Sequence, residues 1–230
     1  VTYKSFFTKE GVLKEKRSLE MRGYDTFVQE AGTYSTLGWL KDPIFSSMLR
    51  WDEATLANVI LHEMTHATIY FKGQTEFNEE MATFVGNQGA IDFLCKKYGN
   101  GSDEVVEATH CQKDDLLFSQ WIDQACQTLS QFYLRKISRD EKLKGREELF
   151  QRLKEEFREK MACFKTEGYK NFEKVDLNNA VLLAYRRYFH RLEKFQVLHE
   201  QLGADTRKVV EHFKTLQEKG DTVVLSSFLQ

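Results

Sequence analysis

The chain has 230 residues, of which 41% are hydrophobic and 13% aromatic, enough to build a substantial core. Its 33 Lys and Arg residues against 35 Asp and Glu residues give a formal net charge of −2. This balance lacks the basic excess of proteins that bind phosphate backbones, so we expect no nucleic-acid partner. No apolar run reaches the length of a transmembrane helix. Because the chain starts at Val1 inside a strand-like segment, we expect further residues before it in the full-length protein.

The first forty residues predict a small strand–helix–strand unit. VTYKSFF is typical of a short strand, and Thr8 can cap a helix that Gly23 ends. The segment YDTFVQEAGTYSTLGWL, residues 24–40, is rich in β-branched and aromatic residues and favours one or two strands. The Asp42-Pro43 pair then indicates a turn.

The rest of the chain predicts helices. Apolar residues recur every three or four positions through the ranges 53–71, 79–98, 114–137, 143–164, 177–202 and 206–219. We therefore expect an α+β fold that is mainly helical, with the strand unit packed on a pair of helices. The predicted organisation is one catalytic domain, 1–230. About residues 1–100 would form one side of a cleft and about 101–230 a helical lobe on the other.

HEMTH, residues 62–66, is the most informative motif. On a helix, residues four apart lie on one face with Cβ atoms about 5–6 Å apart, so His62 and His66 can bind one metal ion. Glu63 turns about 100° away from His62, where a general base for a metal-activated water belongs. Zinc lowers the pKa of its water toward 7 and polarises a carbonyl. The spacing therefore predicts a zinc hydrolase site with Glu63 as the catalytic base.

A third ligand is expected from the next helix. A third histidine six residues after His66 is excluded, because Lys72 stands there. Glu79 and Glu80 lie at the start of a helix that the short connection after His66 folds back beside the first. They point about 100° apart, so one of them would face the ion, and spacing does not select between them. We interpret Asn78 as the cap of this helix.

HEMTH followed by NEEMA, residues 78–82, resembles the gluzincin arrangement, in which the glutamate of an Asn-Glu pair completes the site. Together with TYSTLGWLKDPIFSSML (33–49) and LNNAVLLAYRRY (177–188), these blocks resemble a bacterial family of predicted zinc-dependent aminopeptidases. The chain departs from that family at Gln74, usually aspartate, and at Glu80, usually serine. The resemblance implies a metallopeptidase with one Zn²⁺ per chain, bound by His62, His66 and Glu79.

The resemblance also implies roles for residues around the metal. Tyr188 matches a tyrosine of the third block and is the first candidate to stabilise the oxyanion. It can equally be a core aromatic on the stripe Ala184, Tyr188, Leu192 and Phe195. We expect TYSTLGW to be an edge strand that binds an extended peptide, with Tyr34, Ser35 and Thr36 as its substrate-binding residues. The resemblance places the protein in the cell envelope or periplasm, with a lipid anchor on an upstream segment.

Two other classes of function remain open at this point. One is a non-catalytic scaffold or peptide-binding domain with a structural or vestigial zinc centre, against which the intact Glu63 argues. The other is a metal-dependent hydrolase of another amide or ester. The expected partner is a peptide or protein substrate. The four cysteines show no zinc-finger spacing, and we expect thiols, with a Cys95–Cys111 disulfide as the alternative.

Overall fold

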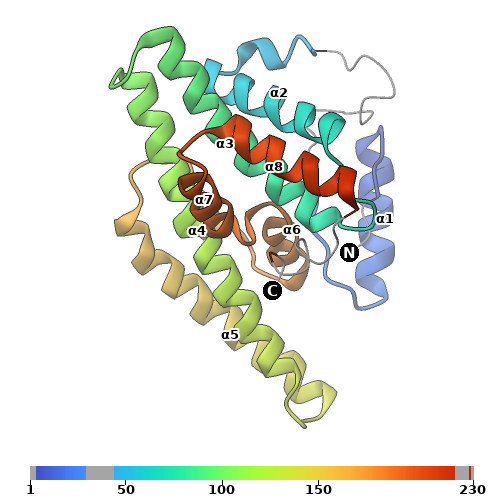
Figure 1. Cartoon of the computed structure of the whole chain (residues 1–230). Coiled ribbons are helices and arrows are strands. Elements are labelled where there is room, and N and C mark those ends of the chain that lie inside the picture. Colours follow the sequence, from blue (N-terminus) through green and yellow to red (C-terminus); the bar gives the residue numbers. More distant parts are fainter. Residues whose placement is uncertain (1–3, 30–43, 221–227, 229–230) are drawn as a thin grey trace. The chain divides into compact units, whose positions relative to one another are not determined.

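Helices make up all the regular structure of residues 4–29, 44–220 and 228, the part of the chain that this computed structural model describes (Figure 1). The helices are α1 (Lys9–Met21), α2 (Glu53–Thr68), α3 (Thr75–Tyr98), α4 (Asp103–Tyr133), α5 (Arg139–Lys160), α6 (Asn179–Phe189), α7 (Leu192–Gln201) and α8 (Thr206–Lys219). Three 3₁₀ turns also occur: η1 (Met48–Arg50), η2 (Met161–Cys163) and η3 (Phe172–Lys174). Of these helices, none is both long and apolar enough to cross a membrane.

The predicted α+β class is wrong, because the described residues contain no strand and the expected strand–helix–strand unit is not formed there. Residues 4–8 and 24–29 flank α1 as irregular chain. The second of these segments packs on helices: the Phe27 ring lies 6.0 Å from that of Tyr185, and the Thr26 carbonyl accepts a hydrogen bond from Asn178 at 3.1 Å. β-Propensity describes a side chain suited to a half-buried surface, and here helices supply that surface. The TYSTLGW segment lies outside the described residues.

Several helix boundaries follow the sequence signals closely. Thr8 caps α1 by accepting a hydrogen bond from the Gly11 N–H at 3.2 Å, and Gly23 follows with a φ of 79°. Helix α8 spans the predicted residues 206–219. The predicted helix over 177–202 is instead two helices, because Arg191 adopts a left-handed conformation with a φ of 60° between α6 and α7. All four cysteines are free thiols.

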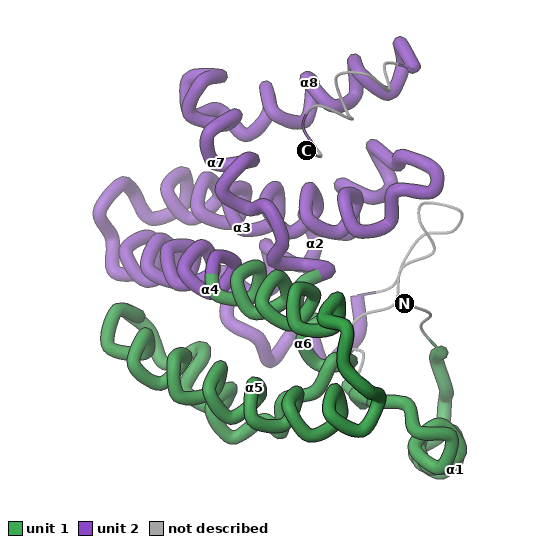
Figure 2. The backbone as a smooth tube through the Cα atoms, turned by 90° about the horizontal axis from the view of Figure 1, so that it is seen from below, with its two compact units in different colours: residues 1–31, 121–186 green, residues 32–120, 187–230 purple. Residues whose placement is uncertain are grey.

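The chain divides into two compact units, coloured separately in Figure 2. Unit 1 comprises Val1–Ala31 and Trp121–Arg186, and unit 2 comprises Gly32–Gln120 and Arg187–Gln230. Every residue of the HEMTH and NEEMA motifs, together with Tyr188, belongs to unit 2. The single catalytic domain with a division near residue 100 stays a prediction.

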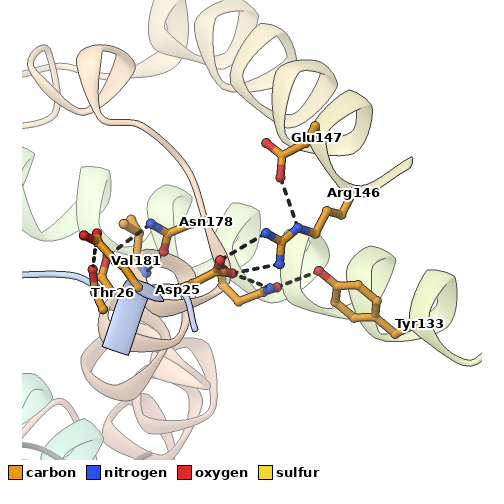
Figure 3. Close-up of polar contacts among 9 residues, drawn as sticks. Asp25, Thr26, Tyr133, Arg146, Glu147, Asn178 and Val181 are labelled. Carbon is orange, nitrogen blue, oxygen red and sulfur yellow. Dashed lines mark hydrogen bonds and ion pairs between the residues drawn. The ribbon is translucent and has the colours of Figure 1, made fainter. Parts of the chain in front are cut away.

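Unit 1 contains a polar cluster around the carboxylate of Asp25 (Figure 3). This carboxylate pairs with Arg146 of α5 at 3.2 Å and accepts hydrogen bonds from the backbone and side chain of Asn179 at 3.2 and 2.7 Å. The hydroxyl of Tyr133 donates to the same asparagine at 3.0 Å. An anionic group at the first residues of α6 satisfies unpaired N–H groups and complements the helix dipole. Asp25 therefore joins the irregular chain after α1 to α4, α5 and α6.

The core of unit 2 is built on one face of α3. Phe77, Met81 and Phe84 recur at helical spacing along α3 and are at most 3% exposed. They pack in one cluster with α7 and α8, which contribute Phe195 and Phe213, both fully buried. The ring of Phe77 lies 5.7 Å from that of Phe195 and 5.3 Å from that of Phe213. This packing holds α3 firmly and leaves its other faces to contact α2 and the segment before α7.

Candidate metal centre

Helix α2 carries HEMTH and begins at a conventional cap. The carboxylate of Asp52 accepts hydrogen bonds from the backbone N–H and hydroxyl of Thr55 at 2.8 and 2.7 Å. Residues 53–68 are then helical, so His62 and His66 lie one turn apart on the side of α2 that contacts α3. His62 is half-buried and His66 is buried at this contact.

A glycine makes the close contact between α2 and α3. A Cβ on Gly86 would lie 2.9 Å from the carbonyl oxygen of Asn58 and 3.3 Å from the Cβ of His62. The first of these atoms is backbone and has no freedom to turn aside. The absence of a side chain at Gly86 therefore lets α3 approach α2 next to a proposed metal ligand.

Asn78 fixes the turn between the two helices. Its amide oxygen accepts a hydrogen bond from the Phe71 N–H at 2.9 Å, and its amide nitrogen donates to the Phe71 carbonyl at 2.8 Å. The predicted cap role is wrong, because α3 begins at Thr75 and Asn78 lies within its first turn. Asn78 is 1% exposed, so it acts as a buried clamp on the extended residues that follow α2.

The two histidines and Glu79 converge at one point. The Nε2 atoms of His62 and His66 are 3.2 Å apart, and they lie 3.4 and 3.5 Å from Oε2 of Glu79. The exposed fractions of the three side chains are 16%, 6% and 21%. Of the two neighbouring glutamates, the one beside the histidines is Glu79, the residue that the resemblance selects. Among the described residues, these three form the one group of candidate metal-binding side chains.

These separations suit a tetrahedral metal ion. Zinc bonds of about 2.0–2.1 Å to nitrogen and oxygen place tetrahedral ligand atoms about 3.3–3.4 Å apart. A metal binds to the lone pair of each Nε2 atom and not to an N–H, so a bound cation would relieve the repulsion among these two nitrogens and the Glu79 oxygen. Two histidines and one carboxylate form a donor set that zinc favours in catalytic sites, where a fourth position is left to water or substrate. The group can therefore hold a zinc ion.

The charge of Glu79 depends on the same contacts. Burial by itself raises the pKa of this carboxyl, but the hydrogen bonds and positive charge of His62 and His66 outweigh burial and lower its pKa from 4.5 to about 2. Glu79 is consequently an anion at any physiological pH and is ready to bind a cation. Nδ1 of His66 is buried and has no hydrogen-bond partner among the described residues.

The remaining predicted residues fall into two groups. Glu63 follows His62 on α2 and is half-buried, and the ring of Tyr188 lies 6.3 Å from that of His62. Tyr188 is near the end of α6, and the helix break at Arg191 separates it from the buried Leu192, so these two residues do not share one helical stripe. Tyr34, Ser35 and Thr36 lie outside the described residues.

Glu80 has a different environment from its neighbour Glu79. It is fully buried and forms a bidentate pair with Arg191, with Nε and Nη2 donating at 3.0 and 2.9 Å. Sequence reasoning did not find Arg191. The sequence did contain one signal: Glu80 stands at a position of α3 where the apolar spacing predicts burial. A buried carboxylate requires a positively charged or hydrogen-bonding partner.

The chain is similar to a known protein family. The family model described as "Putative aminopeptidase" matches residues 1–223 of the chain, and this range includes every residue of the candidate metal centre. No curated protein and no solved structure matches the chain. The match extends over almost the whole sequence, and the chain therefore belongs to the putative aminopeptidase family.

Proposed function

We propose that the protein is a zinc-dependent peptidase of the gluzincin type that removes residues from the amino terminus of peptides. The observation that carries this proposal is the convergence of His62, His66 and Glu79 within hydrogen-bond range of one another. Membership of an aminopeptidase family supports the same reading. The three side chains would hold one Zn²⁺.

Zinc, when bound, supplies a Lewis acid that polarises the scissile carbonyl and makes water acidic near neutral pH. The protein supplies the proton transfers. Glu63 lies beside the ligands on α2 and points about 100° away from His62, so its carboxylate can accept a proton from the attacking water. It then returns that proton to the nitrogen of the departing amine. Removal of such a base typically slows catalysis by about 10²–10⁴-fold.

Tyr188 is the residue that we assign to the developing oxyanion. Its ring lies 6.3 Å from that of His62, and this proximity to a proposed metal ligand supports the assignment. A phenol O–H donates a hydrogen bond that strengthens as negative charge grows on the carbonyl oxygen, which lowers the transition-state energy more than the substrate energy. Tyr188→Phe should therefore lower kcat by about 10²-fold and leave zinc content unchanged.

Two measurements test the function directly. The first is the metal content of the purified protein by elemental mass spectrometry, for which we expect one zinc per chain. Glu79→Ala should lose this zinc, and Glu76→Ala, which removes an exposed carboxylate one turn earlier on α3, should keep it. Absence of zinc from the wild-type protein, even after incubation with the metal, would refute the proposed centre.

The second measurement is hydrolysis of a peptide with a free amino terminus and of the same peptide acetylated there. An aminopeptidase cleaves the first and spares the second, whereas an endopeptidase cleaves both. Glu63→Gln should retain zinc and lose turnover, because the amide preserves the shape of the side chain without its basicity. If Glu63→Gln kept full turnover, the assigned mechanism would be wrong, and a structural metal centre would be favoured.

A further inference from the structure

Three consecutive residues at the start of α3 bind three different parts of unit 2. Asn78 binds the backbone of Phe71, Glu79 faces the two histidines, and Glu80 binds Arg191. Successive side chains on a helix point about 100° apart, so these contacts act on α3 from three directions. Together they limit rotation of the first turns of α3 about its axis.

The Glu80–Arg191 pair joins α3 to the segment that carries Tyr188. Arg191 lies three residues after Tyr188, in the turn between α6 and α7. Its guanidinium makes two hydrogen bonds to Glu80, and the side chains are 12% and 0% exposed. Immediately after Arg191, Leu192 and Phe195 enter the core that Phe77, Met81 and Phe84 of α3 build. The turn is thus held to α3 both by the ion pair and by apolar contacts in the core.

The backbone of Arg191 also requires an explanation. Its φ of 60° and ψ of 17° lie in the left-handed region, which costs energy for any residue except glycine. A bidentate contact of a planar guanidinium with a carboxylate has a narrow geometry and can hold such a conformation in place. A buried ion pair contributes little net stability compared with apolar residues of the same size, so a geometric role is the better explanation for this one.

We propose that the Glu80–Arg191 pair is a positioning device that sets the distance and orientation between the metal-binding residues and Tyr188. The inference rests on the proposed function of those residues. Glu80 fixes the rotation of α3 one residue after Glu79, and Arg191 fixes the turn three residues after Tyr188. Neither side chain contacts the reacting atoms in this role. Their effect on catalysis passes through Glu79 and Tyr188.

The test uses a variant that keeps the fold but lacks the pair, because removing one partner alone leaves a charge in the core and can prevent folding. Glu80→Met combined with Arg191→Met replaces both charged groups by flexible apolar ones. Arg191→Lys, which keeps both charges but loses the planar bidentate contact, is the conservative companion. Leu94→Ala is the control for general destabilisation, since Leu94 is 1% exposed on the far part of α3, in a separate core cluster.

The readouts are zinc affinity by competition with a chelator, the visible spectrum of the Co²⁺-substituted protein, and kcat and KM on a peptide. We expect the double variant to melt close to the wild type, to bind zinc about 10–100-fold more weakly, and to show a changed Co²⁺ spectrum and a lower kcat. Arg191→Lys should recover most of these properties, because both charges remain paired. Leu94→Ala should melt lower and keep the wild-type Co²⁺ spectrum.

Side-chain NMR of the metal-free protein separates this proposal from the proposed function. In the wild type, the ring protons of His62 should show the proximity of the Tyr188 ring, 6.3 Å away between centroids. We expect the double variant to shift the His62 and His66 signals and to weaken that contact. Unchanged histidine signals in the double variant would overturn the positioning role, whether or not the protein binds zinc. Failure of the wild type to bind zinc or Co²⁺ would overturn the metal centre instead.

Discussion

Gly86→Ala tests whether the close approach of α2 and α3 sets the metal centre. The new Cβ would lie 2.9 Å from the Asn58 carbonyl oxygen and 3.3 Å from the Cβ of His62. Ordinary contacts begin at 3.4 Å, so the helices must separate there by about 0.5 Å. Ligand positions in a metal site tolerate about ±0.2 Å. The displacement therefore exceeds what His62 can accommodate without weakening its bond to a metal.

The expected effect on affinity exceeds the effect on stability. Overpacking costs about 1–3 kcal/mol, but alanine is favoured over glycine inside a helix by about 1 kcal/mol. The free energy of unfolding should thus fall by only about 0–2 kcal/mol. Zinc affinity should fall by about 10–100-fold, the usual result of disturbing the support of a metal ligand. Chelator competition measures the affinity, and urea unfolding of the metal-free protein measures the stability.

Gly89→Ala provides the matched control on the same helices. A Cβ at Gly89 would lie 2.7 Å from Cδ1 of Leu61, which is the end of a flexible side chain. Leu61 can change rotamer without moving its backbone, so zinc affinity should stay within about twofold of the wild type and stability should rise or hold. Equal zinc affinity in the two variants would refute the reasoning, since it would mean that helix separation does not control the site.

Three further predictions concern other contacts. Asn78→Ala removes both hydrogen bonds to the backbone of the half-buried Phe71 and should lower the free energy of unfolding by about 2–4 kcal/mol in urea, whereas an unchanged midpoint would show that the clamp contributes nothing. Asp25→Ala should lower the free energy of unfolding by about 2–4 kcal/mol. Glu147→Ala removes a 62% exposed partner of the same Arg146 and should lower it by under about 0.5 kcal/mol. The pKa of Glu79 is lowered from 4.5 to about 2, so its contribution to metal-free stability is complete above pH 4.5 and is lost as pH falls toward 2. Over that range the free energy of unfolding of the metal-free wild type should fall by about 3 kcal/mol more than that of Glu79→Gln. Parallel profiles of unfolding free energy against pH would contradict this.

The helices of the chain and the residues of the site were largely predictable from local patterns. A capping residue marked the start of α1, and apolar spacing marked α2 and α8, because these signals act within a few residues of the backbone they stabilise. The four-residue spacing of His62 and His66 placed both on one face of a helix for the same reason. The choice of Glu79 over Glu80 came from a resemblance, because spacing alone left both open.

Other features depended on contacts between distant residues. The segment after α1 has strand-like composition, but its Phe27 packs against Tyr185 of α6. Local propensity cannot identify such a partner. The predicted helix over 177–202 broke at Arg191, whose side chain binds a carboxylate 111 positions earlier. No pattern within the segment contained that information. Asn78 likewise looked like a cap and instead binds the turn before α3.

The sequence by itself determined which residues offer metal-binding atoms and that two of them share a helical face, because both properties are local. The tertiary structure alone decided that Glu79 meets the histidines and that Glu80 turns away into the core. That decision follows from the packing of α3 against α2, where Gly86 allows close approach, and against the turn at Arg191. A helix presents its side chains in all directions, and the neighbours it packs against determine which of them meet a ligand.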